Sequence, residues 1–338
     1  MPFNILNSVA KLPKNFVGVQ NLWVAVGDIT STSIKPFYSS LNGKDTWTQG
    51  TSTNFFQRLE WRSVAYGKGT WVAVASDGND IAYSNDGKIW SKTNGNYDQG
   101  RRVAYGKDNT GAGIWVIIGY GSSSVLLSWS SNGLNWNSSG SIGGGSPMAV
   151  AYGKDASGAG LWVASGDSSI VYSSTGKGNW NPAANISSVS RIAYGKDASG
   201  AGLWIATTPT NGYSSTNGSI WSIVSGMGGH SNVAYGKDAS GAGVWVAGSS
   251  SLPYIKYSSN GTNWTATTSI ERNGCVDVYA IAYGKDGSGN GLWLISGSSS
   301  GNTLFHSANG KNWTKFISTN NPTNLQRVQS IAFNNVDL

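Results

Sequence analysis

The chain has 338 residues, of which 47 are glycine, 16 are tryptophan and only 12% are charged. Its formal net charge of +7 reflects a shortage of acids, since Glu60 and Glu271 are its two glutamates. The lysines are scattered and form no basic stripe, which argues against a nucleic-acid partner. The single cysteine, Cys275, excludes an internal disulfide and a cysteine-based zinc site.

Residues 1–20 read as an N-terminal extension without the basic and apolar segments of a signal peptide. No apolar run approaches the length that crosses a bilayer. We therefore expect a soluble chain, synthesised in the cytoplasm, that neither inserts into a membrane nor needs a cofactor.

A pair of tryptophans recurs along the chain in every unit of roughly forty to fifty residues, a period typical of propeller blades. The first tryptophan of each pair stands in a phrase such as LWVA, and the second follows a turn rich in Ser, Asn and Gly. The seven pairs are Trp23/Trp47, Trp71/Trp90, Trp115/Trp136, Trp162/Trp180, Trp204/Trp221, Trp245/Trp264 and Trp293/Trp313. Trp61 and Trp129 stand outside this repeat.

Each unit predicts four short strands, which we name A to D in chain order. Strand A carries the phrase AYG, strand B the first tryptophan, strand C a Tyr-Ser-Ser phrase and strand D the second tryptophan. Short strands of β-formers separated by Gly-rich turns indicate an all-β fold. The sequence thus predicts one seven-bladed β-propeller with four-stranded blades over residues 1–338.

The A strands are offset from the tryptophan pairs by one unit. Their aromatic residues are Tyr66, Tyr105, Tyr152, Tyr194, Tyr235 and Tyr283, so the first pair has no A strand before it. The phrase SIAFNN at 330–335 supplies the missing strand, with Phe333 in the tyrosine place. We predict that this C-terminal strand joins the first blade and closes the ring, which removes an open sheet edge.

The turn before the second tryptophan, SNDGKIW at 84–90, resembles a compact Asp-box, the Ser-x-Asp-x-Gly-x-x-Trp signature of bacterial neuraminidase repeats. Versions with Asn in the Asp place recur in other units as SSNGLNW, SSNGTNW, SANGKNW and SSTNGSIW. The resemblance implies a β-propeller in which the box is a structural turn between strands C and D. The style of the repeats is also similar to propellers encoded by large DNA viruses of algae and protists, which implies a virion or surface attachment protein.

Propeller topology places the A-to-B and C-to-D turns on one face and the B-to-C and D-to-A connections on the other. The repeated turns share the first face, whereas the D-to-A segments differ in every blade. Variable loops on a constant scaffold commonly carry binding specificity. These variable segments span 48–62, 91–102, 137–149, 181–190, 222–232, 265–280 and 314–330.

All seven arginines lie in D-to-A segments or at the start of strand A, and a tryptophan accompanies the first of them. Arginine forks suit carboxylate, sulfate and phosphate groups. The alternative is that Arg62, Arg102 and Arg191 cap strand A by bonding carbonyls of the adjacent blade. The candidate ligand-binding residues are Arg58, Trp61, Arg62, Arg101, Arg102, Arg191, Arg272 and Arg327.

We expect a binding protein without catalytic residues, directed to a glycan, an acidic protein surface or a coat protein. A structural interaction scaffold is the alternative, and a degenerate sialidase-like glycosidase is the third. The sialidase Arg-Ile-Pro signature is missing, and acids are few besides Glu60, Glu271, Asp98 and Asp277. His230 and His306 show no triad or metal spacing and are expected at the surface or in turns.

Overall fold

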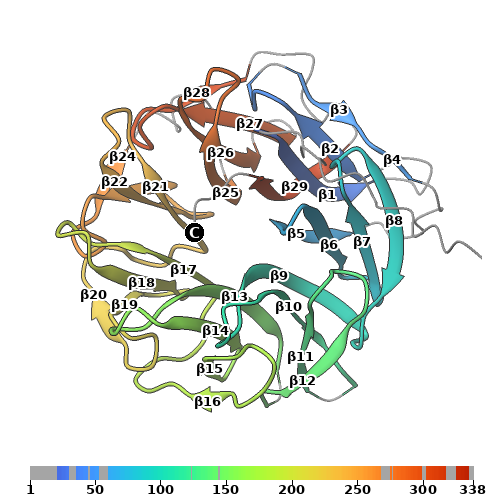
Figure 1. Ribbon diagram of the computed structural model, residues 1–338. Coiled ribbons are helices and arrows are strands. Elements are labelled where there is room, and N and C mark those ends of the chain that lie inside the picture. The colour runs from blue at the N-terminus through green and yellow to red at the C-terminus, as the bar shows by residue number, and fades with distance from the viewer. Residues whose placement is uncertain are drawn as a thin grey trace, which may run out of the picture.

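The computed structural model describes residues 21–29, 36–44, 46–52, 60–122, 124–143, 145–267, 275, 277–298, 302–316 and 325–334. Seven sheets follow one another around a central opening, with the chain running once round the ring (Figure 1). The fold is therefore the predicted seven-bladed β-propeller. No helix that could span a membrane occurs in the described part of the chain.

Each blade has strands A to D in order from the centre outwards. Blades 1 and 2 contain β29 (Leu325–Phe333), β1 (Trp23–Ile29), β2 (Phe37–Ser40), β3 (Thr48–Gln49), then β5 (Trp61–Gly67), β6 (Thr70–Ala75), β7 (Asp80–Ser84) and β8 (Ile89–Asn94). A short strand, β4 (Thr51–Ser52), adds to β8 in parallel. Blades 3 and 4 contain β9 (Gln99–Lys107), β10 (Gly113–Tyr120), β11 (Val125–Ser130), β12 (Asn137–Ser141), then β13 (Pro147–Lys154), β14 (Gly160–Gly166), β15 (Ile170–Ser173) and β16 (Asn181–Pro182).

Blades 5 to 7 repeat the same order. They contain β17 (Arg191–Lys196), β18 (Gly202–Thr207), β19 (Gly212–Ser215), β20 (Ser222–Val224), then β21 (Asn232–Lys237), β22 (Gly243–Gly248), β23 (Ile255–Ser258), β24 (Thr265–Thr267), then β25 (Asp277–Lys285), β26 (Gly291–Ser298), β27 (Asn302–Ser307) and β28 (Thr314–Lys315). Most D strands begin just after the second tryptophan instead of including it, because that tryptophan still belongs to the turn.

The last strand closes the ring as predicted. Strand β29 pairs antiparallel with β1, and Phe333 lies opposite Trp23 with the two ring centroids 4.9 Å apart. The strand begins at Leu325, five residues before the predicted start at 330, and it ends at Phe333. Beyond it, the Asn334 amide donates to the Leu22 carbonyl over 3.0 Å. Blade 1 is thus held by both ends of the described chain.

In the six blades that carry it, the AYG phrase of strand A joins the blade to the next one. A Cβ placed on Gly67 would meet the Tyr105 ring at 2.1 Å, and a Cβ on Gly195 would meet the Tyr235 ring at 2.2 Å. The tyrosine of one blade therefore lies directly on the glycine of the preceding blade. Any side chain there would collide with an aromatic ring, so the glycine is required for close approach and not for its backbone angles.

Replacing Gly195 with Ala is expected to lower the free energy of unfolding by about 1–3 kcal/mol, because the added methyl overpacks the Tyr235 contact. Urea denaturation followed by tryptophan fluorescence measures the change. In a Tyr235→Ala background the same glycine substitution is expected to cost much less, since the ring is gone. Equal costs in both backgrounds would contradict the proposed contact.

The tryptophans of strand B fill the wedges between blades. Trp162, Trp204 and Trp245 are completely buried. Each indole donates from Nε1 to a backbone carbonyl at the end of strand A in the preceding blade, as in Trp204 to the Lys154 carbonyl over 2.8 Å. Bulk and one directed hydrogen bond therefore fix each blade against its neighbour.

The Asp-box-like turns have the expected local geometry. In blade 3 the Gly133 amide donates to Ser130 Oγ over 2.9 Å, and the amides of Leu134 and Asn135 both donate to Asn132 Oδ1 over 2.9 Å. Across the seven turns the glycine φ angles lie between 65° and 78°, which side chains rarely adopt. Asn and Asp serve equally in this Asx turn, and its role in the blade is structural.

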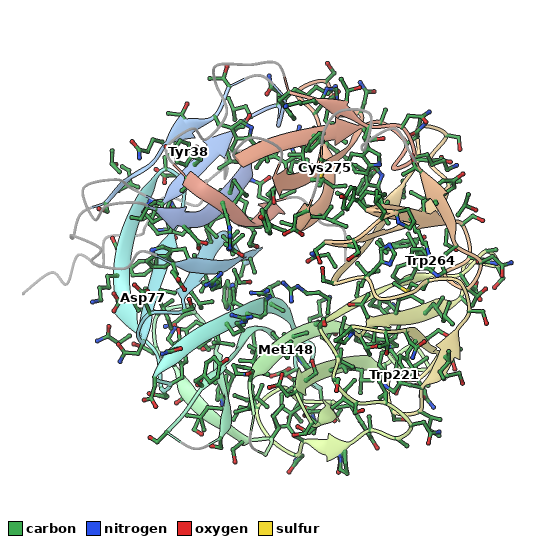
Figure 2. The ribbon with its side chains drawn as sticks, turned by 180° about the vertical axis from the view of Figure 1, so that it is seen from behind. Tyr38, Asp77, Met148, Trp221, Trp264 and Cys275 are labelled. Atoms are coloured by element: carbon green, nitrogen blue, oxygen red, sulfur yellow. The ribbon has the colours of Figure 1, made fainter. Side chains whose placement is uncertain are left out.

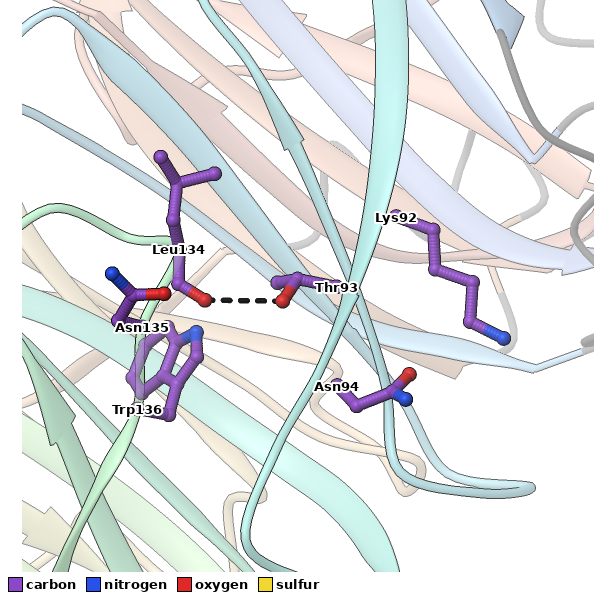
Figure 3. A pocket seen from close by; sticks show the side chains of 6 residues that line it. All are labelled: Lys92, Thr93, Asn94, Leu134, Asn135 and Trp136. Atoms are coloured by element: carbon purple, nitrogen blue, oxygen red, sulfur yellow. Dashed lines mark hydrogen bonds between the residues drawn. The ribbon is translucent and has the colours of Figure 1, made fainter.

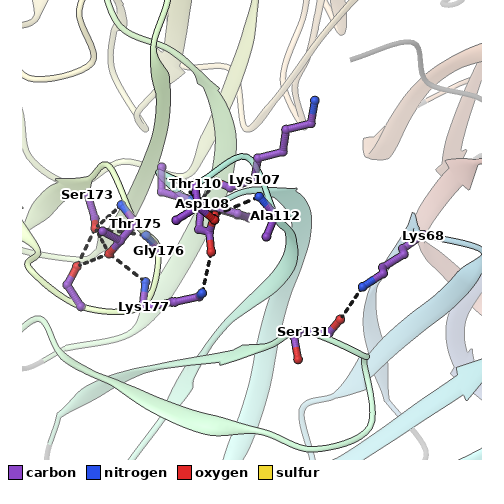
Figure 4. A network of polar contacts seen from close by, with 12 residues as sticks. Lys68, Lys107, Asp108, Thr110, Ala112, Ser131, Ser173, Thr175, Gly176 and Lys177 are labelled. Carbon is purple, nitrogen blue, oxygen red and sulfur yellow. Dashed lines mark hydrogen bonds and ion pairs between the residues drawn. The ribbon is translucent and has the colours of Figure 1, made fainter.

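The repeated A-to-B turn also has a structural role. Asp155 Oδ1 accepts from the Ser157 amide, the Ser157 hydroxyl and the Ala159 amide over 2.7 to 3.0 Å. In blade 3 the equivalent Asp108 also forms an ion pair with Lys177 from the C-to-D turn of blade 4 (Figure 4). Ion pairs of the same kind join Lys44 to Asp286 and Lys311 to Asp238. The recurring phrase thus stabilises turns and links neighbouring blades.

Candidate functional site: the arginine mouth

The inner strands share an irregularity at the end of the channel opposite to these turns. Five of them contain a β-bulge whose extra residue lies four positions before the recurring Tyr or Phe of strand A. These extra residues are Arg62, Arg101, Met148, Tyr279 and Gln329. A bulge interrupts pairing and redirects one side chain. Figure 2 places Met148 beside the central opening, whereas Trp221 and Trp264 lie toward the outer rim.

The next residue of strand A connects adjacent blades. Arg102 Nη1 donates to the Arg62 carbonyl of blade 2 over 3.1 Å, and Asn232 Nδ2 donates to the Val278 carbonyl of blade 7 over 2.8 Å. In blade 2 the Ser63 hydroxyl accepts from the Val103 amide over 3.2 Å. The alternative that an arginine caps strand A against the adjacent blade is therefore confirmed for Arg102.

Arg62 is held by two acids and a hydroxyl. Its guanidinium forms an ion pair with Glu60 and approaches Asp28 at 3.9 Å, while its Nε donates to Ser76 Oγ over 2.9 Å. The Ser76 hydroxyl in turn donates to Glu60 over 2.7 Å. Glu60 and Asp28 are opposed across an isolated bridge between blades 1 and 2. The positive charge of Arg62 is thus offset by two nearby carboxylates.

Arg101 and Arg191 are not compensated in this way. The buried Nε of Arg101 has no hydrogen-bond partner among the described residues, and Arg191 Nη1 donates only to the neighbouring Ser190 carbonyl over 2.8 Å. No salt bridge of either arginine occurs in the described part of the chain. Both guanidinium groups retain donors for an external acceptor.

Burial and mutual repulsion perturb the arginine charges. Burial, followed by the charge of Arg191, lowers the pKa of Arg102 well below its usual value. Burial and the charges of Arg101 and Arg62 lower the pKa of Arg191 to about 10. The arginines whose charges act on one another in this way come from blades 2, 3 and 5. An anion between them would relieve this repulsion.

A cavity of about 130 Å³ lies among these groups. Its polar lining residues are Arg62, Arg102, Arg191, Asn232, Tyr279, Gln329 and Ser330. Drug-sized ligands occupy pockets of roughly 300–1,000 Å³, so this cavity suits one small group at the end of a larger ligand. We call this end of the channel the arginine mouth, defined by Arg62, Arg101, Arg102 and Arg191.

The structure places the other predicted site residues differently. Trp61 is completely buried, with its ring 4.9 Å from Phe37, so its assignment as a ligand-binding residue is wrong. It fills the core between blades 1 and 2, where a tryptophan outside the repeat was mistaken for a functional one. Arg327 is exposed and lies 5.3 Å from the Tyr279 ring, near the mouth. Arg58 and Arg272 lie outside the described residues, as does Glu271.

His230 was expected at the surface or in a turn; it lies in the connection before β21, but it is buried and is not a surface residue. Burial, followed by the charge of Lys256, lowers the pKa of His230 to about 4, so the ring is neutral near pH 7. The described residues contain no group of three or more His, Cys, Asp or Glu side chains that could hold a metal ion.

Sequence reasoning missed four polar residues of the mouth: Asp28, Asn232, Tyr279 and Gln329. Gln329 Nε2 donates to Asp28 over 2.8 Å, and burial raises the pKa of Asp28. Asn232 and Gln329 occupy the positions three and four residues before the aromatic residue of strand A, where other blades carry arginine. Aligning the seven A strands on their aromatic residues would have identified these two.

A second hollow lies on the outer rim between blades 2 and 3 (Figure 3). It has a volume of about 500 Å³ and is lined by Lys92, Thr93, Asn94, Leu134, Asn135 and Trp136. Thr93 Oγ1 donates to the Leu134 carbonyl over 3.0 Å and so links the two blades. The wide opening and the absence of convergent charges make this groove a weaker candidate than the arginine mouth.

No protein-family model matches the chain, and no curated protein matches its sequence. Solved structures share the fold. YCF48 bound to a D1 peptide has a TM-score of 0.54 and 13% identity, covering 78% of this chain and 84% of that chain. Virginiamycin B lyase from Staphylococcus aureus has a TM-score of 0.58 and 10% identity, covering 76% of this chain and 83% of that chain. A functionally unknown protein from Desulfotomaculum acetoxidans has a TM-score of 0.60 and 8% identity, covering 94% of this chain and 100% of that chain. At these identities the likeness shows a β-propeller fold and carries no information on the ligand.

Proposed function

We propose that this protein is a non-catalytic binding module that recognises an anionic group at the arginine mouth. The observation that carries the proposal is a small cavity lined by Arg62, Arg102 and Arg191, with Arg101 on the bulge beside Arg102. Neither Arg101 nor Arg191 forms a salt bridge within the described part of the chain. Uncompensated, partly buried guanidinium groups are costly in a folded protein unless an anion offsets them. A carboxylate, sulfate or phosphate fits both the charge and the cavity volume.

We further propose that the anion belongs to a glycan and that the protein serves in attachment, with a coat protein as a second partner. A terminal sialic acid or sulfate would place one charged group in the cavity while neutral sugars contact the D-to-A segments. The Asx turns and their buried tryptophans support placement among the Asp-box repeat propellers. A structural scaffold that docks an acidic protein surface uses the same charges and is separated by the test below.

Replacing Arg101 and Arg191 with Gln should weaken binding of sialylated or sulfated glycans by at least tenfold, since each loses charged donors to the anion. Binding of the wild-type protein should also weaken with salt, because exposed charge pairs are screened within about 10 Å at 0.1 M. The measurement is titration on immobilised glycans across a salt series.

The matched control removes two lysines, Lys154 and Lys196, from the opposite face and should leave glycan affinity unchanged. Equal losses from both variants, or binding independent of salt, would contradict an anion site at the arginine mouth. Binding to an acidic peptide but to no glycan would favour the scaffold, and YCF48 shows that a propeller of this fold accommodates a peptide.

One observation favours a glycosidase as the second candidate. Asp28 and Glu60 lie beside Arg62 in different environments: burial raises the pKa of Asp28, while the Ser76 hydrogen bond lowers the pKa of Glu60. Carboxyl groups with divergent pKa values can act as acid and base. Release of a fluorogenic aglycone by the wild type, and its loss in Asp28→Asn, would support this candidate over simple binding.

A further inference from the structure

The opposite end of the channel has a different lining. A cavity of about 610 Å³ opens there among Tyr66, Tyr105, Tyr152, Tyr283 and Phe333, with Lys68, Lys107 and Lys154 at its edge. The tyrosines are half-buried, so each presents part of its ring to the opening. We call this end the tyrosine mouth. It lies on the face of the A-to-B turns, away from the arginine mouth.

The aromatic wall is fixed by packing. The ring of Tyr105 lies on Gly67 of the preceding blade and 4.8 Å from Trp115 of its own blade, at an angle of 58°. The Tyr283 and Trp293 rings repeat this arrangement at 5.1 Å and 54°. Rings held in this way require little ordering when a flat ligand stacks on them. Burial raises the pKa of both tyrosines, so their hydroxyl groups remain protonated donors near neutral pH.

The charge around this mouth is positive because its acids are already engaged. The turn aspartates bond their own turns, and Asp108, Asp238 and Asp286 are paired with lysines from C-to-D turns of the next blade. The strand A lysines form no ion pair in the described part of the chain. Lys107, for example, extends away from the polar network that its neighbour Asp108 forms (Figure 4). Lys107, Lys154, Lys196 and Lys237 are all exposed.

We propose that the tyrosine mouth is a second binding site, which takes an aromatic anion: a flat apolar ring system that carries a sulfonate, carboxylate or phosphate. The ring system stacks on the tyrosine wall, and the anionic group reaches the lysines at the edge. The cavity volume falls within the roughly 300–1,000 Å³ of small-molecule pockets. A free inorganic anion would meet only exposed lysines and leave the aromatic wall unused. This site is independent of the function proposed for the arginine mouth.

The probe is 8-anilinonaphthalene-1-sulfonate, whose fluorescence rises when its rings leave water. We expect saturable binding of one probe per chain, with competition by naphthalene-1-sulfonate and none by inorganic sulfate at equal concentration. Replacing Lys107 and Lys154 with Gln should weaken the dissociation constant about threefold to tenfold, since exposed pairs contribute modestly. Tyr66→Leu should weaken it about twofold to tenfold through lost stacking.

Two controls separate this site from others. Lys88→Gln removes an exposed lysine from a C-to-D turn, and Arg101→Gln removes a charge from the arginine mouth; both should bind the probe as the wild type does. Thermal melting of each variant checks that it is folded. Probe binding to many sites, or equal weakening by Lys88→Gln and by the lysine pair, would overturn the proposal. A wild-type protein that binds the probe but no sialylated or sulfated glycan would refute the arginine site alone.

Discussion

Deletion of residues 328–338 should unfold the protein or leave it with a small fraction of its stability. The deletion removes most of β29, including the buried side chains of Val328, Ile331 and Phe333, and leaves the inner edge of β1 unpaired. At about 1.5–3 kcal/mol for each buried apolar side chain, the loss amounts to about 5 kcal/mol or more. Globular domains have a total stability of about 5–15 kcal/mol. Thermal and urea denaturation of the truncated chain provides the measurement.

The matched truncation removes only residues 335–338, which lie beyond the described strand, and keeps Asn334 with its hydrogen bonds to Leu22. This shorter deletion should leave the unfolding midpoint close to that of the wild type. If the longer deletion also melts like the wild type, closure of the ring by β29 is wrong.

Replacing Trp221 with Ala should lower the free energy of unfolding by about 3–5 kcal/mol, the usual cost of removing a buried large aromatic side chain. Trp221 is 2% exposed. Its backbone amide donates to the Ala184 carbonyl of blade 4 over 3.3 Å, so a segment of the neighbouring blade covers it. Trp264, at the same place in its own turn, is half-buried, so Trp264→Ala should cost less (Figure 2).

Urea denaturation of the two variants measures this difference. Glycan binding by the folded fraction should be unaffected in both, because the C-to-D turns lie on the face away from the arginine mouth. A Trp264→Ala variant that keeps its stability but loses binding would move the ligand site to the turn face. Equal costs at Trp221 and Trp264 would show that burial does not govern the contribution of this position.

The blade architecture was readable from the sequence because it is repeated seven times. The spacing of the tryptophan pairs and the place of Phe333 in SIAFNN predicted the sheets and the closing strand. The structure adds that the glycine after each tyrosine lies against the aromatic ring of the next blade. A single unit would have been weak evidence for a propeller blade, whereas seven units at the same spacing were strong evidence for a propeller.

The site was predicted less well, because it depends on features that do not repeat. The bulges that direct Arg62 and Arg101 arise from the D-to-A segments, whose lengths and residues differ among blades. Trp61 stands next to Arg62 in sequence, yet Trp61 is buried between blades while the bulge at Arg62 directs that side chain to the cavity. Asp28 belongs to strand B, and only the pairing of two blades places it beside Glu60.

The tyrosine-on-glycine contact has a consequence for how this ring is assembled. At six of the seven interfaces the aromatic ring of one blade lies on the glycine of the preceding blade, so these interfaces are head-to-tail copies of one contact, a heterologous arrangement that closes by rotation. Between blades 1 and 2, Asn334 stands in the glycine position. The junction of β29 with β1 is the point where the polypeptide changes ends, but Phe333 lies over Gly284 as a tyrosine does elsewhere. The interface between blades 7 and 1 therefore repeats the contact of the other blades, with phenylalanine in place of tyrosine. The blade that contains both ends of the described chain is therefore joined to blade 7 by the same kind of contact that joins the other blades.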